Sequence, residues 1–316
     1  MLIVLTGGGC AGAVSAPLAA TTTGTHGSTG TDPDGSTSTT PGGSGVPVAV
    51  STHVVTFVDA SRRLKYPHRR PIPRPLVTVI RYPTQSTGPL PLIVFGHGFA
   101  VTPAAYYRLL TAWARAGYVV AAPVFPLENA HAPGGPDEAD LVNQPADMSF
   151  VITGMLALSA ERGSFLAGRI SPARIGISGQ SDGAETALAM AYDRYYRDPR
   201  VRAAAILSGA ELPNSQAVYF PRPSPPLLAT QGTADTTNRP HFTYDFFRAA
   251  PRPKYLLRLL GAGHLPPYTT EQPQLSIIER VTIAFFDRYL KGEQAAQARM
   301  TATGDVRGLA ALTAAP

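Results

Sequence analysis

A serine flanked by two glycines stands at a predicted strand-to-helix turn. Residues 174–178 are predicted to form a strand, Gly179-Gln180-Ser181-Asp182-Gly183 follows, and residues 183–196 have helical spacing. On such a turn a serine hydroxyl is exposed above the sheet, and glycines two positions before and after it leave room for strand and helix to approach. The positive end of the helix also points at the reacting centre. The segment therefore predicts a nucleophile at Ser181.

A serine hydroxyl needs a base before it can attack. Asp235 follows a predicted strand at 226–231, and His264 lies in a glycine-rich loop after a predicted strand at 254–260. The chain order Ser, Asp, His is one of the orders in which such triads occur. Because catalytic groups in open α/β sheets gather at the carboxyl ends of strands, we predict that Ser181, Asp235 and His264 form a catalytic triad.

Other side chains compete for these two supporting roles. Glu211 follows the predicted strand at 201–207 and is an alternative acid. His97, His131 and His241 are the other histidines near the edges of the expected site. His97 stands in a turn directly after a central strand, and we expect it to shape that turn rather than to act as the base.

Attack on an ester also needs amide groups that stabilise the oxyanion. We predict the N–H groups of Asp182 and Phe99 as these donors, and we expect the Asp182 carboxylate to point away, toward helix amides or an arginine. Phe99, Tyr106 and Leu265 are expected to line the acyl side of the substrate site. Tyr106 begins a predicted helix and is explained equally well as a core residue.

The elements that must position these residues alternate regularly. Continuous apolar strands separated by helices predict an α/β fold with a mostly parallel sheet covered on both faces, and two leading strands at 54–58 and 76–82 predict an antiparallel edge. The connection 209–226 is too short for a large lid domain, so we expect an open site suited to bulky or polymeric esters. The remaining predicted elements are strands at 92–95, 118–122, 174–178, 201–207, 226–231 and 254–260, and helices at 106–116, 147–161, 183–196, 242–249 and 274–290.

Composition excludes several classes of protein. The chain has 316 residues, 44% of them hydrophobic, and a formal net charge of +6. Its basic residues are scattered and form no nucleic-acid-binding signature, so no nucleic-acid partner is expected. A single cysteine excludes an intramolecular disulfide and a cysteine-based metal site. No apolar run is long enough for a transmembrane span, and no cofactor or metal is expected.

The two ends of the chain differ in composition from its middle. Residues 1–20 resemble a secretory leader, with Cys10 a candidate lipid-anchor site, and residues 21–45 form a Thr/Ser/Gly-rich segment expected to be a disordered tether. These features predict a secreted or cell-surface protein. Residues 46–291 are expected to form the catalytic domain, and the Ala-rich residues 292–316 a loosely ordered tail. The basic, proline-rich segment 62–75 is expected to cross the surface in extended form.

At these motifs the chain resembles the α/β-hydrolase superfamily. It is similar to secreted bacterial esterases related to dienelactone hydrolase, platelet-activating-factor acetylhydrolase and cutinase-like polyester hydrolases. The resemblance implies a serine carboxylic ester hydrolase with an acyl-enzyme intermediate, the predicted triad and the predicted oxyanion donors. An acyltransferase with the same triad and a non-catalytic surface-binding protein are the alternatives. Polyester hydrolases of this group usually have His and Met where this chain has Gln180 and Asp182. The matching segments are Arg81-Tyr82-Pro83-Thr84, Pro91–Phe99, Gly179–Gly183, Gly232–Asp235 and Gly261–His264.

Overall fold

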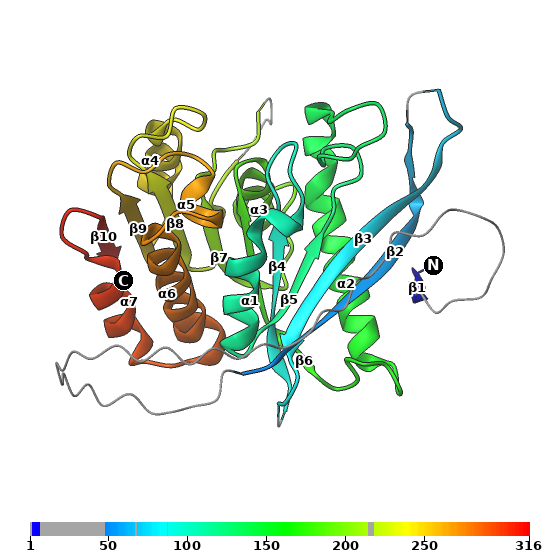
Figure 1. The fold of residues 1–316 in the computed structure, drawn as a ribbon, viewed down its shortest axis with the longest axis horizontal. Coiled ribbons are helices and arrows are strands. Elements are labelled where there is room, and N and C mark those ends of the chain that lie inside the picture. The colour runs from blue at the N-terminus through cyan, green and yellow to red at the C-terminus, as the bar shows by residue number, and fades with distance from the viewer. Residues whose placement is uncertain (1, 7–47, 67, 87, 214–217) are drawn as a thin grey trace, which may run out of the picture. The chain divides into compact units, whose positions relative to one another are not determined.

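A single sheet runs through the middle of the protein, with helices packed on both of its faces (Figure 1). The computed structural model describes residues 2–6, 48–66, 68–86, 88–213 and 218–316. Within these residues the sheet has ten strands in the order β1-β2-β3-β5-β4-β6-β7-β8-β9-β10. The strands are β1 (Leu2–Thr6), β2 (Val50–Leu64), β3 (Ile72–Pro83), β4 (Leu90–Gly96), β5 (Val119–Pro123), β6 (Ile170–Gln180), β7 (Val201–Leu207), β8 (Leu227–Gly232), β9 (Lys254–Leu259) and β10 (Ala310–Ala315).

The six central strands, β5, β4, β6, β7, β8 and β9, pair in parallel. Strands β1, β2 and β3 add antiparallel pairs at one edge, and β10 adds one at the other. The predicted mixed sheet with an antiparallel edge is therefore confirmed. Parallel pairing brings the carboxyl ends of β4, β6, β8 and β9 to the same edge of the sheet, where the predicted site residues follow them.

Two apolar layers hold the helices on the sheet. Helices α2 (Gln144–Ala160), α3 (Asp182–Tyr192) and α4 (Pro240–Ala249) share one buried cluster with it, while α1 (Tyr107–Arg115), α6 (Gln274–Phe286) and α7 (Ala296–Gly304) share the other. In β4, Leu92 and Val94 belong to the first cluster and Ile93 and Phe95 to the second. Burial on both faces is why these strands are continuously apolar in sequence. The shorter turns are η1 (Pro103–Tyr106), η2 (Glu138–Asn143), α5 (Pro266–Thr269) and η3 (Asp287–Lys291).

The basic segment 62–75, expected to be a surface crossing, is part of the long antiparallel hairpin of β2 and β3. Pro73 and Pro75 pair with β2 on one side. β5 pairs with β3 only over Thr78–Arg81, so the prolines lie where the other side of β3 lacks a ladder partner. Proline is tolerated there because no ladder hydrogen bond is lost.

Arg74 of this hairpin is buried rather than solvated. Its Nε donates to Asp147 Oδ1 at 2.7 Å, and its Nη1 donates to Asp140 Oδ1 at 3.1 Å. All three side chains are buried, and Arg62 Nη2 also lies 2.7 Å from Asp147 Oδ1, so the charges of this network compensate one another. This network fastens the hairpin to η2 and α2, the segment that leads to one wall of the site.

The expectation of a loosely ordered tail over 292–316 is wrong. These residues form α7, which packs on the sheet through the buried Met300, and β10, which pairs with β9 from Ala310↔Leu259 to Ala315↔Lys254. Strand β10 is held at the edge of the sheet largely by backbone hydrogen bonds, so it does not need large apolar side chains. Its sequence therefore lacks the apolar pattern that would have predicted a strand. The folded unit therefore continues to the last residue.

The predicted tether at 21–45 and most of the predicted leader at 1–20 lie outside the described residues, Cys10 included. Of the leader, residues 2–6 are described and pair as β1 with β2. Among the residues that the structure describes, no helix is both long and apolar enough to span a membrane.

Candidate active site

Ser181 occupies a strained turn between β6 and α3. Its φ of 56° and ψ of −126° lie where residues with a side chain are rarely found. The turn is possible because Gly179, Gly183 and Gly96 bring three backbone segments together, and a methyl group on any of them would overlap neighbouring backbone atoms. The predicted need for side-chain-free neighbours two positions before and after the serine is therefore confirmed.

The structure brings Ser181, Asp235 and His264 together from three separate loops. The Nε2 of His264 lies 2.9 Å from Ser181 Oγ, and its Nδ1 lies 2.7 Å from Asp235 Oδ2. Asp235 Oδ1 accepts the amide N–H groups of Thr237 and Asn238, at 3.0 and 2.9 Å. With Nδ1–H donated to this fixed carboxylate, Nε2 is left as an acceptor for the serine hydroxyl.

The rival residues lie in other surroundings. Glu211 is exposed and does not contact His264, whose Nδ1 is taken by Asp235. His131 and His241 are exposed side chains, and His241 stacks on Phe242.

His97 shapes its turn, as predicted. Its ring is fully buried, with Nδ1 2.8 Å from the carbonyl oxygen of Gly98 and Nε2 accepting the N–H of Phe125 at 3.0 Å. Burial lowers the pKa of His97 to about 4, so the ring is neutral at physiological pH. A neutral ring can make both hydrogen bonds at once, and it fixes the loop that carries Phe99.

The two predicted oxyanion donors are the amide directly after the nucleophile and the amide directly after Gly98, a residue that packs against Ser181. Among the described residues, the amide N–H groups of Phe99 and Asp182 have no hydrogen-bond acceptor. Asp182 begins α3, where the first amides of a helix are free and its dipole is positive. Both amides are therefore available to a negative oxygen.

The expectation that Tyr106 lines the substrate pocket is wrong, because its side chain is fully buried. Its hydroxyl accepts the Gly98 N–H at 3.2 Å and donates to Gln180 Oε1 at 2.7 Å. Tyr106 is thus a core residue, and it also joins the loop before Phe99 to the residue before the nucleophile.

Gln180 extends this chain to the histidine loop. Its Nε2 donates to the carbonyl oxygen of His264 at 3.2 Å and lies 3.3 Å from His264 Nε2. Sequence reasoning noted Gln180 only as a departure from the related polyester hydrolases. The sequence did offer one indication of this contact: Gln180 directly precedes Ser181, and His264 was predicted to lie next to Ser181.

The Asp182 carboxylate does not point away from Ser181, contrary to expectation. Its Oδ1 lies 3.3 Å from Ser181 Oγ, farther than the histidine nitrogen, and its Oδ2 is buried without a hydrogen bond of normal geometry among the described residues. Glu128 lies behind it, fully buried, with neither carboxyl oxygen in a hydrogen bond of normal geometry. Burial first, and Asp182 second, raise the pKa of Glu128 to about 11.

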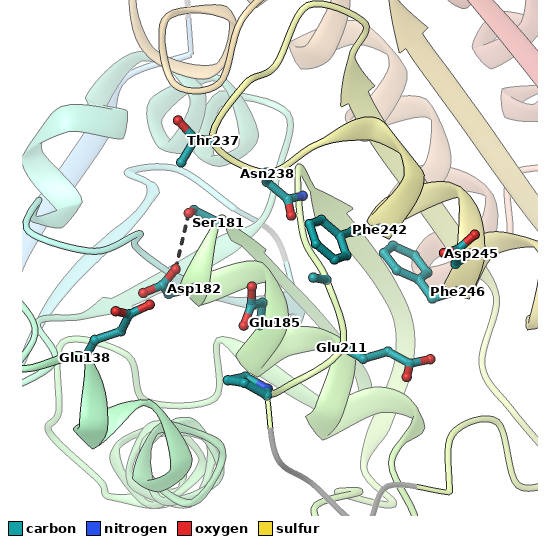
Figure 2. Close-up of a pocket in the computed structure, with 12 residues that line it drawn as sticks. Glu138, Ser181, Asp182, Glu185, Glu211, Thr237, Asn238, Phe242, Asp245 and Phe246 are labelled. Carbon is teal, nitrogen blue, oxygen red and sulfur yellow. Dashed lines mark hydrogen bonds between the residues drawn. The ribbon is translucent and has the colours of Figure 1, made fainter.

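A pocket of about 650 Å³ opens beside the nucleophile (Figure 2). Its lining comes from η2, the start of α3, the connections after β7 and β8, and α4. Phe99, which is 42% exposed, and the partly buried Leu265 do not line this pocket. Sequence reasoning named Asp182 and Glu211 in other roles and missed the remaining acidic side chains of the lining, Glu138, Glu185 and Asp245.

The described residues include no group of three or more His, Cys, Asp or Glu side chains arranged to hold a metal ion. The chemistry that this arrangement can perform is a serine attack assisted by a histidine base and two backbone amides.

A mostly parallel sheet with a serine on the strained turn between β6 and α3 defines an α/β-hydrolase. A family model described as Chlorophyllase matches residues 51–208, half of the chain. The protein therefore belongs to the chlorophyllase family and to its class, the carboxylic ester hydrolases. The matched region contains Ser181 and ends before Asp235 and His264. No curated protein matches the chain.

Proposed function

We propose that the protein is a serine esterase that hydrolyses carboxylic esters through an acyl-enzyme. The observation that carries this proposal is the contact of His264 Nε2 with Ser181 Oγ at 2.9 Å, with Nδ1 held by Asp235 at 2.7 Å. A histidine bridging a serine and a buried carboxylate is the arrangement that activates a hydroxyl on several unrelated folds.

In the first half of the reaction, Ser181 Oγ attacks the ester carbonyl carbon while its proton passes to His264 Nε2. The carbonyl oxygen becomes negative and accepts the amide N–H groups of Phe99 and Asp182. As the tetrahedral intermediate collapses, the bond to the alcohol breaks and the imidazolium returns the proton to the leaving oxygen. Asp235 stabilises that imidazolium and holds its orientation.

In the second half, a water molecule gives a proton to His264 and attacks the acyl carbon. The bond to Ser181 then breaks, the serine recovers its proton, and the acid leaves. Gln180 and Tyr106 act as positioning residues because they connect the histidine loop to the loop that carries Phe99. Loss of one oxyanion donor costs such enzymes about 3–4 kcal/mol in the transition state.

The substrate range and location belong to the same proposal. The site lies in a pocket open to solvent, which supports bulky or polymeric esters, cutinase-like polyesters among them. Residues 1–20 and 21–45, with their leader-like and Thr/Ser/Gly-rich composition, support export to the cell surface or the medium. Membership of a family named for chlorophyll makes chlorophyll an ester to include in the substrate panel.

The test combines active-site labelling with turnover. A fluorophosphonate should label the full-length protein stoichiometrically at Ser181 and abolish hydrolysis of p-nitrophenyl butyrate, and Ser181→Ala should be neither labelled nor active. A chain-length series of p-nitrophenyl esters, an aliphatic polyester film and chlorophyll then define the range. Turnover that rises strongly with added alcohol identifies an acyltransferase instead. A folded protein with neither labelling nor turnover refutes the proposal in favour of a binding role.

A further inference from the structure

The pocket beside Ser181 is acidic in a protein that is basic overall. The chain has a formal net charge of +6, yet five acidic side chains line the pocket, and the part of the chain that the structure describes contributes no lysine, arginine or histidine to it. Figure 2 shows the carboxyl groups of Glu138, Asp182 and Glu185 together below Ser181. Charge of one sign gathered in a concave surface selects for ligands of the opposite sign.

Most of these carboxylates have no cation of the protein beside them. Asp245 pairs with Arg248. For Glu138, Glu185 and Glu211 the described residues supply no ion pair. Asp182 is more than nine-tenths buried and lines the pocket, and its Oδ2 has no hydrogen bond of normal geometry to the described residues. Asp182 is thus the lining carboxylate withdrawn from water, whereas Glu138 and Glu211 are exposed, and a buried charge of this kind is costly unless a ligand compensates it.

Burial and the proximity of these acidic side chains raise the pKa values of two of them. Burial first, then Asp182 and Glu138, raise the pKa of Glu185 to about 8, so this group holds its proton at neutral pH. Burial also raises the pKa of Glu211, with Asp193 and Asp245 adding to the effect. Every charged group that acts on these two carboxyls is itself acidic. A bound cation would favour the ionised form of Glu185 and so release its proton.

The pocket also has an aromatic wall. Phe242 of α4 is 45% exposed and, with the buried Phe246, lines the pocket. The face of an aromatic ring attracts organic cations, quaternary ammonium groups above all. Because the exposed ring of Phe242 lies in the same lining as the carboxylates, the cation that suits this pocket is an organic one.

We propose that this enzyme prefers esters that carry a quaternary ammonium or protonated amine, with the cation seated among Asp182, Glu185 and Glu211 and against Phe242. The inference rests on the proposed esterase function, because it places the cationic part of the substrate next to Ser181. The acidic lining selects a positive charge, which the substrate can carry on either the alcohol or the acyl side of the ester. Esters of an amino alcohol and esters of an amino acid-like acyl group share this chemistry.

The experiment compares isosteric esters at pH 8 under constant ionic strength. Butyrylcholine and 3,3-dimethylbutyl butyrate differ in one charge and hardly in shape. On the acyl side the matched pair is ethyl 4-(trimethylammonio)butyrate and ethyl 5,5-dimethylhexanoate, in which the charge is too far from the carbonyl to activate it. We expect kcat/KM at least ~10-fold higher for a cationic ester than for its neutral counterpart. If the preference appears only with the charge on the alcohol side, the alcohol part of the ester enters the pocket, and if it appears only with the charge on the acyl side, the acyl part does. Tetramethylammonium should inhibit competitively, and its binding should release protons in calorimetry across buffers of different ionisation enthalpy.

Two variants test whether the pocket carboxylates Glu185 and Glu211 bind the cation. Glu185→Gln and Glu211→Gln should each lower the ratio of kcat/KM for cationic over neutral ester ~2–5-fold, with melting temperatures confirming that they fold. Glu161→Gln removes an exposed carboxylate that does not line the pocket, so the ratio should not change.

The outcomes separate the two proposals. Equal turnover of charged and neutral esters, or a ratio unaffected by both pocket variants, refutes the cation preference while the esterase function stands. Binding of tetramethylammonium without labelling of Ser181 or turnover of any ester refutes the esterase function while the cation site stands.

Discussion

Glu128 should destabilise the folded protein because it must hold a proton there. Its carboxyl is fully buried against Asp182, and its pKa is about 11, against an ordinary value of 4.5. The change Glu128→Gln removes the need for that proton and keeps the shape of the side chain. The new amide can take over the hydrogen bond that the protonated Glu128 carboxyl shares with Asp182. We therefore expect this buried substitution to stabilise the protein.

The magnitude follows from proton linkage. The folded protein keeps the Glu128 proton up to about pH 11, whereas the unfolded chain loses it above about pH 4.5. The folded state thus binds more protons in this range, so the contribution of Glu128 to stability falls as pH rises, by about 1.4 kcal/mol per pH unit. At pH 7 the cost is roughly 3 kcal/mol. The uncharged amide introduced by Glu128→Gln carries no such cost at any pH.

Urea unfolding followed by circular dichroism at pH 6, 7 and 8 measures the difference directly. The free energy of unfolding of Glu128→Gln should exceed that of the parent by roughly 1–3 kcal/mol at pH 7, and the gap should widen as pH rises. Glu161→Gln, at an exposed carboxyl, is the matched control and should show neither effect. A variant less stable than the parent, or a gap independent of pH, refutes the reasoning.

Three further substitutions test how the site is held. Tyr106→Phe leaves two buried polar groups without partners, so stability should fall by ~1–3 kcal/mol in urea unfolding and kcat for p-nitrophenyl butyrate by ~10-fold with little change in KM; unchanged kcat contradicts this. Arg74→Met removes the ion pair of the buried Asp140 and one of the two arginines that pair with Asp147, and calorimetry should report a loss of about 3–5 kcal/mol. Gly179→Ala, whose methyl would overlap the carbonyl of Gly183, should yield little soluble protein; a folded, fluorophosphonate-reactive variant contradicts the described turn.

The alternation of strands and helices in the middle of the chain was predictable. Strands such as 92–95 and 119–122 are buried on both faces, so they are continuously apolar in sequence. The turn around Ser181 was predictable because only glycine fits where strand, helix and Gly96 meet. Local patterns of this kind are written in consecutive residues, and no distant contact is needed to read them.

Other features depended on contacts between distant segments. Nothing near Arg74 in the sequence indicates that it pairs with Asp140 of η2 and Asp147 of α2, which compensate its charge. Strand β10 exists because β9 offers a free edge, and its own side chains carry little apolar signal.

By itself, the sequence determined the class of fold and the order Ser181, Asp235, His264, because strand–turn–helix chemistry is local and its residue types are restrictive. Only the tertiary structure decided that Tyr106 is core rather than pocket and that Gln180 links it to the histidine loop. It also decided that carboxylates from η2, α3 and α4 face one space beside the nucleophile. Burial and through-space charge depend on which segments meet, and that is fixed only when the whole sheet and its helices pack together.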